Sequence, residues 1–202
     1  MHAGPAIVRR EASSNRVVKT IPRWYLAVLA AVALEKLREL RISGVNEAAS
    51  HSRVHAAPQS YPLMVAAHVG LVTLPAVEVA GRDDRRPRWR WALVLGAATA
   101  LRLWSIRSLG EAWNVRGAVP WRLRPVTSGP YAYIRHPNYL AVILEFAAVP
   151  MLAGARLSAL LLSTLNAIVL FDRIRAEERL LNASRSYRRH FANRARFIPR
   201  VF

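Results

Sequence analysis

Apolar and polar positions alternate along this chain in long blocks, which is the pattern of a helical membrane protein. Five apolar blocks lie at residues 22–40, 61–80, 89–109, 139–154 and 157–171. A helix needs about 20 apolar residues to cross the hydrocarbon core of a bilayer. The pattern therefore predicts an all-α, integral membrane bundle of about five transmembrane helices.

Three of the blocks depart from a simple span. The first opens with Trp24 and Tyr25, which suit the headgroup interface, but residues 35–41 are charged. We expect this charged half to leave the bilayer as an amphipathic helix. The last two blocks are short and separated by two residues, so residues 139–171 are predicted to form a tight helical hairpin.

The blocks divide the chain into three regions. Residues 1–20 are polar and basic and are expected to form a flexible tail. Residues 21–110 hold the N-terminal transmembrane helices, and residues 111–202 form the candidate catalytic region. Arg156 is the one arginine in the hairpin turn, whereas the polar segments at the other end of the hairpin are rich in arginine. The positive-inside rule then places these arginine-rich polar segments in the cytosol, where we expect them to form a cap over the bundle. Alternation over five spans puts the N-terminus outside.

The composition argues against several classes of function and site. The chain has 202 residues, a formal net charge of +18, and 53% apolar residues. Such a charge is typical of nucleic-acid-binding proteins, but a soluble protein of that kind is not this apolar, so no nucleic-acid partner is expected. There is no cysteine, and the nine glycines never form G-x-G, which argues against thiolate sites and a dinucleotide fingerprint. Six histidines without cysteine give little support to a metal site.

The segment 126–140 carries the candidate chemistry. Residues 128–130, Ser-Gly-Pro, predict a turn, and Pro137 suits the first turn of a helix. Arg135 and His136 come directly before that helix, whose free N–H groups attract anions. This arrangement predicts a carboxylate or phosphate site at the membrane boundary, although a basic interfacial loop explains it equally well.

An acidic pair, Glu177 and Glu178, follows the last apolar block among many arginines. The two carboxylates could form salt bridges, or they could hold a cation such as an amino group or a sulfonium.

Together these segments resemble the isoprenylcysteine carboxyl methyltransferase family of integral membrane, S-adenosylmethionine-dependent enzymes. The resemblance covers about residues 90–202 and rests on Gly-Pro-Tyr at 129–131, Arg-His-Pro-x-Tyr at 135–139 and the acidic pair. Residues 37–43 and 61–68 resemble bacterial members found beside type III polyketide synthases, which are thought to O-methylate alkylpyrones or alkylresorcinols.

The resemblance implies a cofactor under the cytosolic cap. It assigns cofactor binding to Gly129, Pro130, Tyr131, His136, Tyr139, Glu177 and Glu178. Glu178, with Glu177, would pair with the amino group of the cofactor. Arg135 would meet a carboxylate, either of the cofactor or of the methyl acceptor.

The catalytic candidates are Arg135, Asn138 and Glu145. A carboxylate acceptor needs only orientation by Arg135, whereas a hydroxyl acceptor needs a base, for which Glu145 and His136 are the nearest candidates. Glu145 lies two turns after Asn138 on the same helix face. The structural alternative for Glu145 is an ion pair with Arg102 or Arg107 inside the bundle.

Two further ionisable residues in the second apolar block are weighed in the same way. His68 is interpreted as a hydrogen-bonded residue of the bundle rather than a catalytic one, and Glu78 as an interfacial residue near a helix end.

We therefore expect a membrane-bound O-methyltransferase, in the bacterial inner membrane, that acts on a lipophilic or prenylated acceptor. A ring hydroxyl is slightly preferred over a prenylcysteine carboxylate as the methyl-accepting group. The alternatives are an NADPH-dependent sterol or steroid reductase, a phospholipid N-methyltransferase, and a basic protein that only binds anionic lipid. Pro137 and the acidic pair favour the methyltransferase over the reductase.

Overall fold

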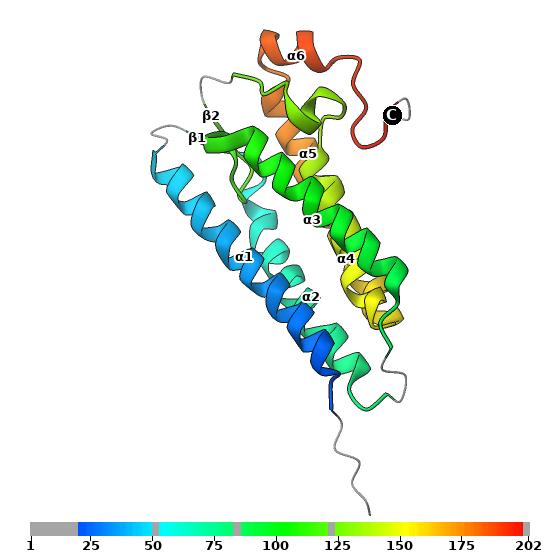
Figure 1. The fold of residues 1–202 in the computed structure, drawn as a ribbon. Helices are drawn as coiled ribbons and strands as arrows, with labels where there is room; N and C mark the ends of the chain where they lie inside the picture. Colours follow the sequence, from blue (N-terminus) through cyan, green and yellow to red (C-terminus); the bar gives the residue numbers. More distant parts are fainter. Residues whose placement is uncertain (1–19, 50–52, 83–85, 121–123, 200–202) are drawn as a thin grey trace, which may run out of the picture.

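The computed structural model describes residues 20–49, 53–82, 86–120 and 124–199, and these parts are mainly helical (Figure 1). Their α-helices are α1 (Arg23–Ala49), α2 (Tyr61–Val79), α3 (Trp89–Leu109), α4 (Pro137–Leu152), α5 (Arg156–Leu181) and α6 (Arg185–Phe191). The all-α prediction is confirmed. The tail expected at residues 1–20 lies, apart from Thr20, outside the described residues.

The five long helices alternate in direction (Figure 1). One end of the bundle holds the end of α2, the start of α3 and the turn between α4 and α5. The other end carries a cap of short elements: η1 (Pro58–Ser60), η2 (Gly110–Ala112), η3 (Gly129–Ala132), α6, and an antiparallel pair of strands, β1 (Arg53–His55) and β2 (Ala118–Pro120). The strand pair was not predicted, because three residues are too few to show an alternating pattern.

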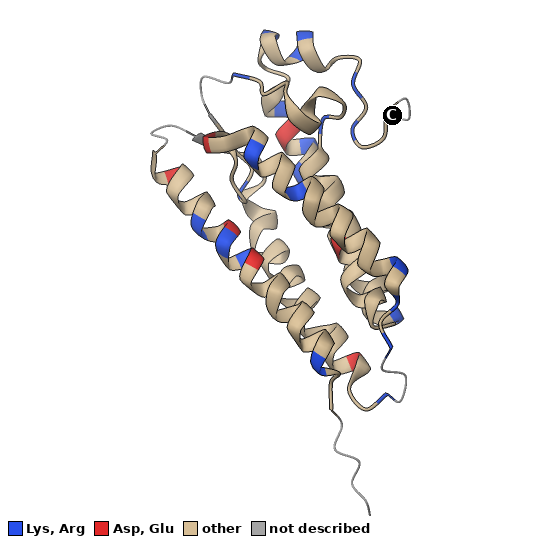
Figure 2. Ribbon diagram, in the orientation of Figure 1, with Lys and Arg blue, Asp and Glu red and all other residues tan. Residues whose placement is uncertain are grey.

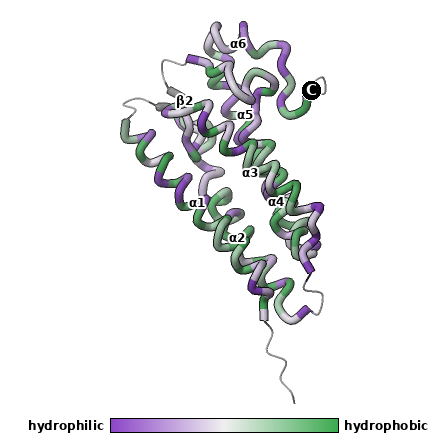
Figure 3. Tube along the Cα trace, viewed as in Figure 1, coloured by the Kyte–Doolittle hydropathy of each residue, from purple (hydrophilic) through white to green (hydrophobic). Residues whose placement is uncertain are grey.

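Three helical stretches are long and apolar enough to cross a membrane, namely Pro58–Val79, Trp89–Ala112 and Arg156–Leu181. The apolar α4 has 16 residues and is shorter, as expected from the sequence. Charged residues gather at the two ends of the bundle and along α1, and the middle of α2 to α5 is mainly hydrophobic (Figures 2 and 3). The expectation of five spans is thus met in part, by three candidate spans.

The charged half of α1 is helical, as predicted, and it also directs charged side chains into the bundle. The helix continues without a break to Ala49, and Glu39 is buried. Lys36 and Glu39 contact charged partners on α4 and α3, so residues 35–41 present charge toward the bundle as well as away from it. Oppositely charged partners on neighbouring helices make this inward placement tolerable.

The hairpin of α4 and α5 is confirmed, with its turn at residues 153–155. Gly154 has a φ of +75°, a backbone conformation that glycine adopts without strain. Glu78 of α2 accepts hydrogen bonds from the backbone N–H and the hydroxyl of Ser158, at 2.7 and 2.6 Å, and so caps the start of α5. These hydrogen bonds hold the end of α2 against the start of α5.

Helix α5 continues ten residues past the expected end at Phe171. Arg173, Ile174, Ala176 and Glu178 are buried in this extension, which packs under the cap. The acidic pair is therefore part of a rigid helix rather than of a segment that follows it.

Helix α4 is the centre of the bundle and packs against both α3 and α5. The Tyr25 hydroxyl donates to the Val149 carbonyl at 2.9 Å and ties α1 to α4. The core between the helices includes Leu29, Leu71, Phe146, Val149, Leu162 and Leu170. This packing fixes α4, whose first turn carries the candidate site.

Candidate active site

The turn before α4 is held tightly against α3. Gly129 has a φ of +60°, and a Cβ atom there would lie 2.1 Å from the Ser108 hydroxyl oxygen. Glycine is therefore required both for the backbone conformation and for the close approach. The turn then buries the Tyr131 ring, and burial raises the pKa of its hydroxyl above the usual value.

The C-terminal segment completes this part of the cap. The N–H groups of Arg135 and His136 donate to the carbonyls of Ala195 and Arg196, at 2.9 and 3.0 Å. Arg194 donates from its guanidinium to the Tyr131 carbonyl at 2.5 Å. Helix α4 then starts at Pro137, as the sequence predicted.

Glu178 is occupied by cationic and hydrogen-bonding side chains. Its carboxylate lies 3.1 Å from His136 Nε2, 3.3 Å from Arg135 Nη1, and accepts two bonds from Arg196 at 3.0 and 2.6 Å. The bonds to Glu178 raise the pKa of Arg196. Because both carboxylate oxygens are engaged, Glu178 acts in the structure as the link between the C-terminal segment and the start of α4.

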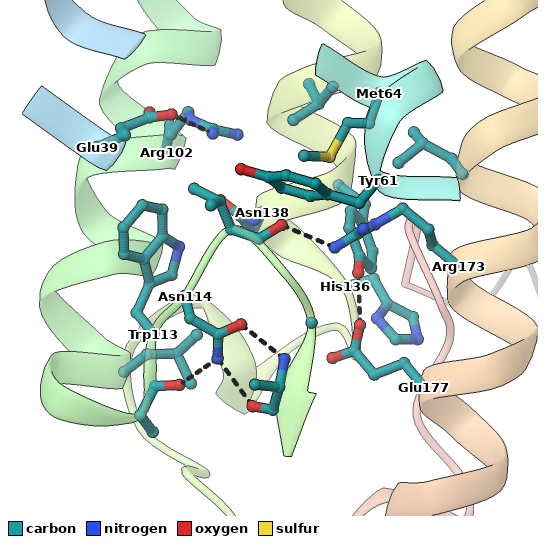
Figure 4. Close-up of a pocket in the computed structure, with 18 of the residues that line it drawn as sticks. Glu39, Tyr61, Met64, Arg102, Trp113, Asn114, His136, Asn138, Arg173 and Glu177 are labelled. Atoms are coloured by element: carbon teal, nitrogen blue, oxygen red, sulfur yellow. Dashed lines mark hydrogen bonds and ion pairs between the residues drawn. The ribbon is translucent and has the colours of Figure 1, made fainter. Parts of the chain in front are cut away.

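Glu177 has a different environment. It accepts one hydrogen bond, from the Tyr139 hydroxyl at 2.5 Å, and lines a cavity (Figure 4). Glu178 does not line that cavity. The two adjacent glutamates therefore differ in their contacts, since Glu177 lines the cavity and Glu178 bonds to residues of the cap.

The cavity has a volume of about 500 Å³ and extends from the cap into the membrane bundle. Arg173 of α5 lines it with a side chain only 3% exposed. Its Nη2 donates to the Val115 carbonyl at 2.8 Å, whereas Nε and Nη1 have no partner among the described residues (Figure 4). A buried guanidinium with free N–H groups is costly unless an anion or another acceptor satisfies it.

Sequence analysis did not single out Arg173, because it lies in a run of charged residues. A usable signal was present in its spacing, since residues 173 and 177 are one helical turn apart and share a face of α5.

The bundle end of the cavity is also polar. Lys36, Glu39, His68 and Arg102 line it. Arg102 forms a two-fold hydrogen-bonded ion pair with Glu39, and Lys36 pairs with Glu145 at 2.8 Å. Glu145 thus forms a bundle ion pair of the expected kind, but its partner is Lys36 rather than Arg102 or Arg107.

The structure brings most of the predicted site residues to one place. The cavity is lined by Tyr131, Arg135, His136, Asn138, Tyr139 and Glu177, and it is not lined by Gly129, Pro130, Glu145 or Glu178. Glu145 is only 4% exposed and contacts the cavity through Lys36. The Oδ1 atom of Asn138 is buried without a partner among the described residues, which leaves it available to a bound molecule.

Comparison with known proteins agrees with this geometry. Residues 91–183 match the model of the isoprenylcysteine carboxyl methyltransferase (ICMT) family. The chain is also 30% identical over 163 residues to the uncharacterized protein YpbQ of Bacillus subtilis (strain 168). The aligned region covers 78% of this chain and 95% of YpbQ. The chain belongs to the ICMT family.

In this ICMT-family methyltransferase, the residues that match the family model form α3, the turn before α4, and the α4–α5 hairpin. That region contains Arg135, His136, Tyr139 and both glutamates of the acidic pair. Helices α1 and α2 lie outside it, although they supply much of the bundle end of the cavity. Family membership implies the use of S-adenosylmethionine.

Proposed function

We propose that this chain is a membrane O-methyltransferase that transfers a methyl group from S-adenosylmethionine to a lipophilic acceptor. The observation that carries the proposal is a single cavity with two different ends. Under the cap it presents Arg173 and Glu177, and at its other end it is bordered by exposed apolar side chains of α1 and α2.

The cap end suits the cofactor. Glu177 and Arg173 lie one turn apart on α5 with opposite charges, which matches the ammonium and carboxylate of the methionine part of the cofactor. Arg135 supplies a second cation at the same end. The volume of about 500 Å³ lies within the usual range for ligand sites. The bound cofactor would supply an electrophilic methyl group on a sulfonium.

The bundle end suits an acceptor that arrives through the bilayer. Leu37 and Leu40 of α1 and Val65 and Val69 of α2 line the cavity, and each is more than 40% exposed. A lipophilic molecule would therefore enter between α1 and α2. Helix α4 offers no such opening, because its residues that line the cavity are wholly or partly buried.

Methyl transfer requires alignment of acceptor oxygen, methyl carbon and sulfur in line, and exclusion of water. The Tyr139–Glu177 hydrogen bond fixes one wall of the cavity, and Asn138 offers an amide oxygen to orient a bound group. We place the chain in the inner membrane with its cap in the cytosol, because the polar cofactor is made in the cytosol.

The test uses protein purified into lipid nanodiscs. Calorimetry should show saturable binding of S-adenosylmethionine, and labelled methyl groups should appear on a 5-alkylresorcinol or on an S-farnesylcysteine. Binding of NADPH instead would favour the reductase, and methylation of phosphatidylethanolamine in the disc would favour the phospholipid N-methyltransferase. Absence of any nucleotide-cofactor binding would leave only the lipid-binding alternative.

A further inference from the structure

We infer that His68 is the proton acceptor for a weakly acidic hydroxyl on the methyl acceptor, so that the enzyme selects hydroxyl compounds over carboxylates. The inference rests on the proposed methyltransferase function and specifies its acceptor. It assigns a catalytic role to a residue of α2, outside the region matched by the family model.

The hydrogen bonding of His68 fixes the tautomer of its ring. Nδ1 lies 2.8 Å from the Met64 carbonyl oxygen. A carbonyl can only accept, so Nδ1 carries the proton, and in the neutral ring Nε2 has a free lone pair. No hydrogen bond among the described residues reaches Nε2, and His68 lines the cavity. The ring is further held edge-on to Phe146, with centroids 5.0 Å apart.

The charged groups around His68 are already paired with one another. Lys36, Glu39, Arg102 and Glu145, from α1, α3 and α4, lie close enough to interact electrostatically with the ring. They form three ion pairs, Lys36–Glu145, Arg102–Glu39 and Lys36–Glu39. Glu35 of α1 adds a further carboxylate to this cluster, with one buried oxygen that lacks a partner among the described residues. None of these carboxylates bonds to His68 in the described structure, so the Nε2 lone pair stays free for a group bound in the cavity.

The reaction balances with this base alone. A lone pair of the acceptor oxygen forms the new bond to the methyl carbon, and the carbon–sulfur bond breaks with its electron pair remaining on sulfur. The hydroxyl proton moves to Nε2, and the imidazolium later releases it to water through the cavity. A carboxylate acceptor is already ionised at pH 7, so it would have no use for this base.

The experiment compares His68→Gln and His68→Phe with wild type in nanodiscs, using a 5-alkylresorcinol and an S-farnesylcysteine as acceptors. The phenylalanine variant keeps the ring packing against Phe146 but removes the lone pair. We expect kcat for the resorcinol at pH 7 to fall about 10²- to 10⁴-fold in both variants, with unchanged affinity for S-adenosylmethionine. Below the phenol pKa of about 10, the remaining rate should rise about tenfold per pH unit, because it depends on prior ionisation of the acceptor.

The matched control is His190→Gln on α6. His190 makes the same ring-to-carbonyl contact, Nδ1 to the Ser186 oxygen at 2.9 Å, but on the exposed surface. This variant should retain wild-type activity. The role of His68 would be overturned if its variants lost activity equally toward both acceptors. It would also be overturned if resorcinol methylation survived both substitutions. Wild-type methylation of the carboxylate acceptor alone would overturn the acceptor class while leaving the methyltransferase function intact.

Discussion

Neutralising the two adjacent glutamates one at a time separates cofactor binding from cap stability. Glu177→Gln removes a charge that faces the cavity, and Glu178→Gln removes a charge already bonded to His136 and Arg196. We therefore expect the first variant to lose affinity for S-adenosylmethionine and the second to lose thermal stability. Glutamine has nearly the same shape as glutamate, so neither variant changes the packing around the side chain.

The magnitudes follow from the number and exposure of the contacts. A charge-assisted hydrogen bond contributes about 1.5–3 kcal/mol, so Glu177→Gln should weaken binding about 10- to 100-fold. Glu178→Gln leaves Arg135 and Arg196 facing a neutral amide. Because Arg196 is 47% exposed and partly screened by water, we expect a loss of about 1–3 kcal/mol of stability rather than the full cost of a broken buried pair.

Calorimetry measures the affinity of each purified variant for S-adenosylmethionine, and a thermal-shift assay without cofactor measures stability. The reasoning fails if Glu178→Gln weakens binding more than Glu177→Gln while its melting temperature stays at the wild-type value. That result would make Glu178 the direct partner of the cofactor and Glu177 a support for Tyr139.

Three further predictions concern the cap and the bundle. Gly129→Ala should destabilise the protein by about 1–3 kcal/mol, because it combines a positive φ with a 2.1 Å clash against Ser108; a melting temperature equal to wild type would contradict this. Burial raises the pKa of Tyr131 and Tyr187, so the unfolded state loses these protons first and stability should fall as pH rises above about 10; alkaline melting curves should fall less steeply for Tyr187→Phe. In this cysteine-free chain, single cysteines at Arg116 and Arg189 should be labelled from the cytosolic side and one at Arg156 from the other side; opposite labelling of the first two would refute a single cap.

Sequence periodicity located α2 and α3 almost to the residue, because long apolar runs bounded by arginine and proline leave little freedom in where a helix begins and ends. It did not show the end of α5 or the inward-facing charges of α1. In both places the polar residues face other protein groups, and such burial depends on partners from distant helices that a local pattern does not contain.

The candidate site shows the same limit. The motif at 129–139 and the acidic pair were found from spacing and resemblance, and the structure brings them together under the cap. Which glutamate faces the cavity, and which cation pairs with Glu145, depends on side-chain direction in three dimensions. Arg173 became a candidate, and His68 changed from a bundle residue to a candidate base, only once the structure showed their hydrogen bonds.

The segment that bonds to Arg135 and His136 has a consequence for biosynthesis. Residues 194–196 leave the ribosome after all five long helices, at a time when the bundle can already be inserted in the bilayer. Until they dock, Glu178 lacks Arg196 and the start of α4 lacks its backbone partners. A nascent chain is thus anchored in the membrane before its proposed cofactor site is complete, and we expect proteolytic trimming of this segment to leave a membrane-bound chain that lacks these contacts.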